Sequence, residues 1–107
     1  MNESCGLSQQ DFDIVVSVLS YYPQIEEAII FGSRAKGNFK TGSDVDIALK
    51  GSNLNLNVIS QISFTLNEET VLPYKFDILN FHTISNSDLT DHINRVGIIF
   101  YKSGDLL

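Results

Sequence analysis

The chain is poor in cysteine and in basic residues, and it has no long apolar run. Its 107 residues include one cysteine, Cys5, which cannot form an internal disulfide and agrees with a reducing compartment. No apolar stretch approaches the roughly 18–20 residues that cross a membrane. A signal peptide's basic and apolar regions are missing from the N-terminal MNESCGLSQQD. The sequence therefore predicts a soluble cytoplasmic protein that does not bind a membrane.

Acidic residues outnumber basic ones. Thirteen Asp and Glu against seven Lys and Arg give a net charge of −6 and a pI near 4.6. A dedicated DNA or RNA binder normally shows a basic face, so a nucleic-acid partner is not expected. Three of the seven basic residues follow directly on Gly32-Ser33, namely Arg34, Lys36 and Lys40. We interpret at least one of them as facing an anion; the alternative is an ordinary solvated loop.

The length of 107 residues predicts a single domain over residues 1–107. With 43% hydrophobic residues the chain can bury a core. It is too short to add a separate domain for recognising a second substrate. Either that substrate is small or a partner supplies the missing surface.

Hydrophobic periodicity predicts an alternation of helices and strands. Helices are expected at Gln9–Tyr21 with Ser8 as N-cap, at Leu54–Asn67, and at Asp88–Arg95 with Ser87 as N-cap. Strands are expected at Glu27–Phe31, Val45–Lys50, Tyr74–Phe81 and Ile98–Lys102. Arg34–Gly42 is expected to be a loop, with room for a short helical turn after Ser33. Because no long crossover helix separates the first two strands, they can pair in antiparallel fashion.

Two features around the first two strands suggest chemistry on a phosphate. Gly32-Ser33 ends the first strand, and a turn of small residues can bring N–H groups close to a phosphate. Ten residues later come Asp44 and Asp46, which share one strand face because Val45 points the other way. Two such carboxylates can hold divalent cations.

A third acid, Asp77, lies between Phe76 and Ile78 in the third predicted strand. An aspartate in a buried strand is costly without a partner, and joining Asp44 and Asp46 at a metal would offset that cost. The alternative is an edge-strand aspartate that faces water. His82 and His92 are not in a ligand spacing, so surface or capping roles are expected for both.

The combined pattern resembles the nucleotidyltransferase superfamily of DNA polymerase beta, whose signature is Gly-Ser, about ten residues, and Asp-x-Asp. Within it, the chain is similar to the minimal nucleotidyltransferases, which are commonly paired with HEPN-domain toxins in toxin–antitoxin systems. The resemblance implies an α+β fold, with a mixed, mostly antiparallel sheet and helices packed on one side.

The resemblance also implies site residues and ligands. Catalysis and binding of Mg²⁺ or Mn²⁺ are assigned to Asp44, Asp46 and Asp77. ATP or another nucleoside triphosphate is expected to be bound by Gly32, Ser33, Arg34, Lys36 and Ser43.

Two functions agree with these residues. The first is an enzyme that transfers a nucleoside monophosphate, AMP from ATP by resemblance, to a hydroxyl such as a tyrosine of a HEPN-type toxin. The chain would then be the antitoxin. The second is a non-catalytic nucleotide-binding subunit or antitoxin that neutralises its partner by contact. Self-association is compatible with both.

Overall fold

The computed structural model describes residues 5–40 and 42–103 of the chain. The elements and their bounds are α1 (Gln9–Leu19), β1 (Glu27–Phe31), α2 (Gly32–Lys36), β2 (Val45–Lys50), α3 (Leu56–Glu68), β3 (Phe76–Asn80), the 3₁₀ turn η2 (Phe81–Thr83), α4 (Ser87–Val96) and β4 (Ile98–Lys102). All four predicted strands and the three longer predicted helices are confirmed. The short helical turn allowed within the predicted loop is present as α2, although it starts at Gly32, before Ser33. The assignment of one domain to residues 1–107 stays a prediction.

Local capping explains where the longer helices begin. Ser8 caps α1 through a reciprocal pair of bonds, because its Oγ accepts the Asp11 N–H and the Asp11 carboxylate accepts the Ser8 N–H, both at 3.1 Å. The prediction of Ser87 as the cap of α4 is wrong by one residue. Asn86 is the cap, and its Oδ1 accepts the N–H of Asp88 at 2.9 Å.

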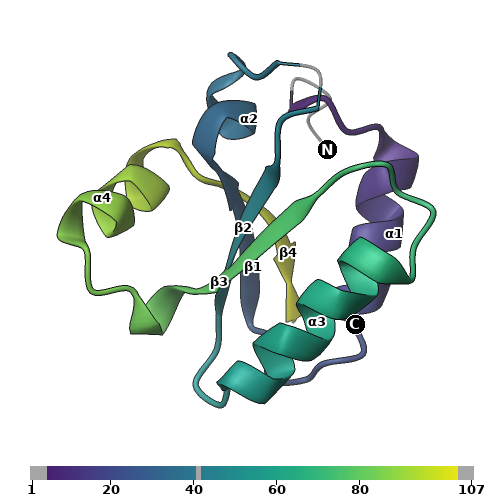
Figure 1. Cartoon of the computed structure of the whole chain (residues 1–107). Helices are drawn as coiled ribbons and strands as arrows, with labels where there is room; N and C mark the ends of the chain where they lie inside the picture. The colour runs from purple at the N-terminus through teal and green to yellow at the C-terminus, as the bar shows by residue number, and fades with distance from the viewer. Residues whose placement is uncertain (1–4, 41, 104–107) are drawn as a thin grey trace.

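The four strands form one sheet in the order β3-β2-β1-β4. β1 is antiparallel to both β2 and β4, whereas β2 and β3 are parallel and connected through α3. This arrangement confirms the mixed, mostly antiparallel sheet of the predicted α+β class. It places the start of β2 between the end of β1 and the start of β3, at the end of the sheet next to α2 (Figure 1).

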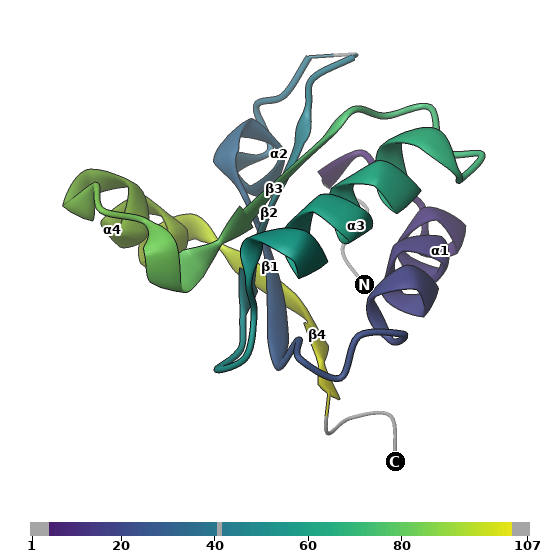
Figure 2. The same cartoon turned by 60° about the horizontal axis from the view of Figure 1, so that its bottom comes forward.

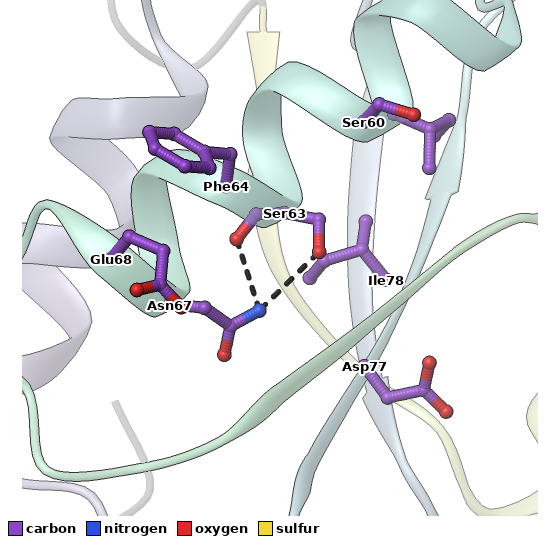
Figure 3. A pocket seen from close by; sticks show the side chains of 8 residues that line it. Ser60, Ser63, Phe64, Asn67, Glu68, Asp77 and Ile78 are labelled. Carbon is purple, nitrogen blue, oxygen red and sulfur yellow. Dashed lines mark hydrogen bonds between the residues drawn. The ribbon is translucent and has the colours of Figure 1, made fainter.

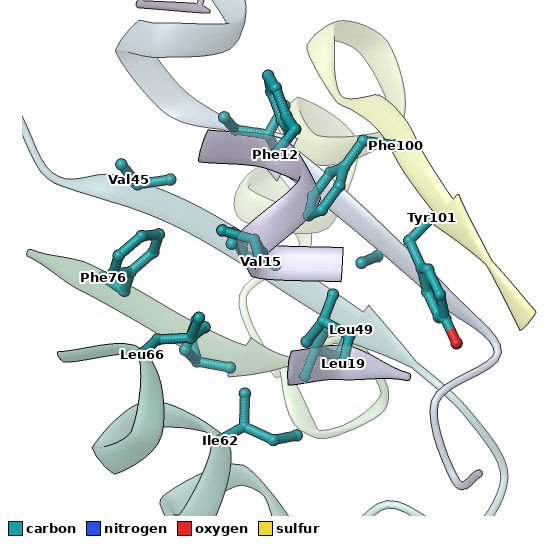
Figure 4. Close-up of a cluster of buried hydrophobic side chains, with 14 of the residues drawn as sticks. Phe12, Val15, Leu19, Val45, Leu49, Ile62, Leu66, Phe76, Phe100 and Tyr101 are labelled. Atoms are coloured by element: carbon teal, nitrogen blue, oxygen red, sulfur yellow. The ribbon is translucent and has the colours of Figure 1, made fainter. Parts of the chain in front are cut away.

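The main core lies between the sheet and the helices α1 and α3 (Figure 4). Alternate residues of β1 and β2 face it, among them Ile30, Ile47 and Leu49, which are at most 1% exposed. The predicted packing of helices on one side therefore holds for α1 and α3. Helix α4 differs, because its Ile93 packs against Ile29 and Ala48 on the opposite face of the sheet (Figure 2).

Candidate functional site

Strand pairing brings the Gly32–Ser33 turn and the acidic residues to the same end of the sheet. Phe31, the last residue of β1, is paired with Asp46 of β2, and Gly32 follows directly. In the parallel pair, Asp46 is the register partner of Asp77. Adjacent strands lie about 4.8 Å apart, so these two acids are neighbours on the sheet. The register thus joins three segments that are separate in the sequence.

The three predicted acids differ in exposure. Asp44 precedes β2 and is exposed, Asp77 on the edge strand β3 is exposed, and Asp46 between them is half-buried. Burial raises the pKa of Asp46, and the charges of Asp77 and Asp44 raise it further, while the Arg34 guanidinium acts in the opposite direction. The charges of the other two carboxylates are therefore felt at Asp46, where a cation would relieve the repulsion.

The protein side chains alone do not form a metal cage. Within residues 5–40 and 42–103, no three His, Cys, Asp or Glu side chains are gathered closely enough to hold a metal ion. The binding of one metal by Asp44, Asp46 and Asp77 together stays a prediction. The donor set still fits Mg²⁺, which is usually held by one or two carboxylates together with substrate phosphates.

Gly32 is required by the close approach of Asp46. Its φ of +75° is in the left-handed region, and a Cβ at this position would clash with Oδ2 of Asp46. The Gly32 N–H is not directed at solvent, since it donates to Nε2 of His92 at 3.2 Å. Of the two turn residues, Ser33 is therefore the one left to offer a hydroxyl and an N–H to a phosphate.

His92 was not predicted to belong to the site. Besides accepting the Gly32 N–H, its ring meets the ring of Phe31 edge-on, with centroids 6.2 Å apart. A signal for this placement exists in the sequence: His92 is the i+3 member of the helical stripe formed by Leu89, Ile93 and Val96. Leu89 and Ile93 of that stripe pack against the sheet.

Arg34 has a structural role in the fold, and its predicted nucleotide contact stays a prediction. The residue is 3% exposed, and its guanidinium lies over the rings of Phe39 and Tyr74. Its Nε and Nη2 donate to the Ser43 carbonyl at 3.1 and 2.8 Å, and Nη1 donates to the Cys5 carbonyl at 2.9 Å. Arg34 thereby holds the backbone directly before Asp44.

The remaining predicted binding residues lie around the same turn. Ser33 is half-buried and Lys36 is exposed at the end of α2. The Ser43 hydroxyl accepts the Lys40 N–H at 2.9 Å and so stabilises the loop before Asp44. Nucleotide contacts of Ser33, Lys36 and Ser43 stay predictions.

A hollow of about 430 Å³ lies between α3 and β3, and Asp77 lines one end of it (Figure 3). Asn67 of α3 crosses this gap. Its Oδ1 accepts the Phe76 N–H at 2.7 Å and its Nδ2 donates to the Phe76 carbonyl at 3.0 Å. Both bonds hold the backbone directly before Asp77, whose carboxylate points away from Asn67 (Figure 3).

Comparison with protein families assigns the class. The family described as polymerase beta, nucleotidyltransferase matches residues 10–105, and the chain belongs to this family. No curated protein shows a significant match to the chain. Within the described residues, no helix is long and apolar enough to cross a membrane.

Solved structures with the same fold include three toxin–antitoxin structures. A toxin–antitoxin with AMP-PNP is similar with a TM-score of 0.73 and 18% identity, over 89% of this chain and 76% of that one. The toxin–antitoxin MntA-HepT gives a TM-score of 0.69 and 16% identity, over 92% and 75%. A tri-AMPylated Shewanella oneidensis HEPN toxin in complex with MNT antitoxin gives 0.70 and 16%, over 92% and 76%. At these identities the likeness shows the fold.

Proposed function

We propose that this chain is a metal-dependent nucleotidyltransferase that moves AMP from ATP to a tyrosine hydroxyl of a HEPN-type toxin, and thereby acts as its antitoxin. The observation that carries the proposal is the contact between the Gly32 turn and Asp46, next to the register pair of Asp46 and Asp77. It combines a candidate phosphate contact with carboxylates suited to a divalent cation. The AMP-PNP and AMPylated-toxin complexes with the same fold support the choice of donor and acceptor.

Metal binding, triphosphate binding and proton acceptance fall to different residues in this proposal. Asp44 and Asp46 would hold Mg²⁺ or Mn²⁺, which neutralises phosphate charge when bound. The Ser33 hydroxyl and the exposed Lys36 would bind the triphosphate. Asp77, exposed on the edge strand, would ligate the metal or accept the proton of the acceptor hydroxyl.

The reaction is an in-line displacement at the α-phosphorus of ATP. The acceptor oxygen forms a bond to this phosphorus as the bond to the oxygen that bridges to the β-phosphate breaks. Pyrophosphate leaves, and the hydroxyl proton passes to a base, for which Asp77 is the candidate.

A mass measurement on the partner tests the proposal. The chain is mixed with ATP, Mg²⁺ and a HEPN-type toxin, and this partner is weighed by mass spectrometry. We expect the mass to rise by whole AMP units. General-base help is typically worth about 10²–10⁴ in rate, so Asp77→Ala should lower turnover on that scale while ATP still binds.

The contact-only alternative makes a different prediction. If the chain neutralises its partner without transfer, toxicity is suppressed while the partner's mass stays unchanged. Asp46→Asn and Asp77→Ala would then suppress toxicity as well as the wild-type chain does. An unmodified partner together with full protection would contradict the enzymatic proposal.

A further inference from the structure

Helix α4 contacts the Gly32–Ser33 turn through one side chain. Nε2 of His92 accepts the Gly32 N–H at 3.2 Å, from a position 60 residues further along the chain. The same ring contacts Phe31 edge-on at an interplanar angle of 79°. His92 is therefore in contact with two successive residues at the point where β1 passes into the turn.

This contact supplies a hydrogen-bond acceptor that the residues at the start of α2 do not provide. Gly32 is the first residue of α2, so its N–H has no partner within the helix. The N-cap residue is Phe31, which makes no side-chain cap hydrogen bond. The side chain of His92, from α4, accepts the Gly32 N–H in place of a local cap. Because Gly32 is also left-handed and lies against Asp46, the orientation of its peptide affects both the turn and the acid.

We infer that His92 is a positioning residue of the nucleotide site. By accepting the Gly32 N–H, it fixes the peptide that joins Phe31 to Gly32 at the entry to the turn, and so directs the Ser33 hydroxyl and N–H that follow toward a triphosphate held beside Asp46. The inference rests on the proposed function and adds to it a residue from α4. His92 does not itself contact the nucleotide in this role.

The chain contains a matched control for this contact. Nε2 of His82 accepts the Gly51 N–H at 3.3 Å, and the His82 ring meets Phe81 edge-on with centroids 6.0 Å apart. Gly51 directly follows β2, at the opposite end of that strand from Asp46. The two histidines thus make the same pair of contacts, one beside the candidate site and one far from it.

The experiment compares His92→Phe, His92→Gln and His82→Phe. Phenylalanine keeps an aromatic ring against the neighbouring phenylalanine but removes the acceptor, whereas glutamine keeps an acceptor at a similar reach. ATP affinity is measured in the presence of Mg²⁺ by calorimetric titration, and thermal unfolding is measured on the same preparations. Hydrogen exchange of the Gly32 amide, followed by NMR without nucleotide, reports directly on the bond.

We expect His92→Phe to weaken ATP binding by about tenfold, because a partly buried N–H loses its partner. His92→Gln should stay within about threefold of the wild-type affinity, and His82→Phe should leave it unchanged while lowering thermal stability as much as His92→Phe does. Turnover at saturating ATP should change less than the affinity, since the bond is made in the ground state and the transition state alike. The Gly32 amide should exchange faster in His92→Phe alone.

Three results would overturn the inference. ATP affinity in His92→Phe could equal or exceed that of the wild type, which would make His92 irrelevant to binding or a competitor of the phosphate. His92→Gln could bind as weakly as His92→Phe, or His82→Phe could show the same loss. If His92→Phe does not fold, His92→Leu takes its place as the acceptor-free variant. A wild-type chain that binds no ATP would instead refute the proposed function, and the inference with it.

Discussion

The two faces of the sheet bury very different amounts of side chain. On the face toward α1 and α3, nineteen buried residues within the described part of the chain form one cluster. On the opposite face the buried cluster has four members, Ile29, Phe31, Ala48 and Ile93. Asp46 lies on this second face, since it alternates with Val45 and Ile47, which point into the main core.

Under the proposed function, stability and chemistry belong to opposite faces of the sheet. The face toward α1 and α3 excludes water and supplies most of the apolar burial. The face toward α4 keeps its acids accessible to water, and Asp46 is only half-buried. Substitutions on the first face should therefore change the free energy of unfolding, and substitutions on the second should change function.

The largest effect is expected from Asp46→Asn on the face toward α4. It removes a charged candidate metal ligand while keeping the shape of the side chain, so transfer should fall by about 10²–10³-fold, as when a group that stabilises transition-state charge is lost. Turnover is measured at saturating Mg²⁺ by the mass increase of the partner, with circular dichroism as the control for folding. Near-normal turnover would show that the proposed metal site is wrong.

The matching change on the other face is Ile62→Ala in α3. Ile62 is fully buried, and the loss of its side chain should lower the free energy of unfolding by about 2–5 kcal/mol. The control in the same helix is Phe64→Ala at a residue that is 59% exposed, where a change within about 0.5 kcal/mol is expected. Urea unfolding measures both. If Ile62→Ala folds fully yet loses ATP affinity, a substitution on the core face also changes function, and the assignment of stability and function to separate faces is wrong.

A smaller effect is expected from Gly32→Ala, with Gly37→Ala as its matched control. Both glycines have a left-handed φ, +75° and +80°, so alanine at either should cost about 1–2 kcal/mol of stability. A Cβ at Gly37 meets nothing within 4 Å, whereas one at Gly32 clashes with Asp46 Oδ2. We expect Gly32→Ala to be the less stable variant and the only one to lose ATP affinity. Equal affinities in the two variants would refute a role for the close approach.

The smallest expected effect concerns pH. Because burial and the charges of Asp77 and Asp44 raise the pKa of Asp46 in the folded chain, the folded state binds the proton more tightly than the unfolded state. The free energy of unfolding therefore falls as pH rises from the ordinary aspartate pKa through the raised one. Asp46→Asn lacks this fall, so without metal its free energy of unfolding at pH 7 should be higher than that of the wild type.

The advantage of Asp46→Asn should disappear near pH 3, where the wild-type carboxyl is protonated. Urea unfolding of both chains between pH 3 and pH 8, in the presence of a chelator, measures the difference. An advantage that does not vary with pH would mean that it arises from packing and not from charge.

Local pattern was enough to predict the elements. The bounds of Glu27–Phe31, Val45–Lys50 and Ile98–Lys102 agree with the structure, because apolar, β-branched runs between turn residues are a short-range signal. The third strand was predicted too long, as Tyr74–Phe81 in place of Phe76–Asn80. At its ends the backbone passes into a loop and a 3₁₀ turn without any change in composition that would mark the boundary.

The candidate site was only partly predictable. Asp44, Asp46 and the Gly32–Ser33 turn are joined by a short connection, and antiparallel pairing of β1 with β2 brings them together. The burial of Arg34 was missed, since its partners are backbone carbonyls, and nothing in the residue types of Cys5 or Ser43 indicates such a bond.

The sequence by itself determined which residues face which side of each strand, because side chains in a strand alternate whatever the strand packs against. It also determined the place of the turn and the candidate acids. Only the tertiary structure decided that Asp77 is the register partner of Asp46 and that His92 holds the Gly32 N–H. The first pair is separated by 31 positions in the sequence and the second by 60. At such separations, strand order and helix packing determine which side chains come into contact, and local sequence patterns predict neither.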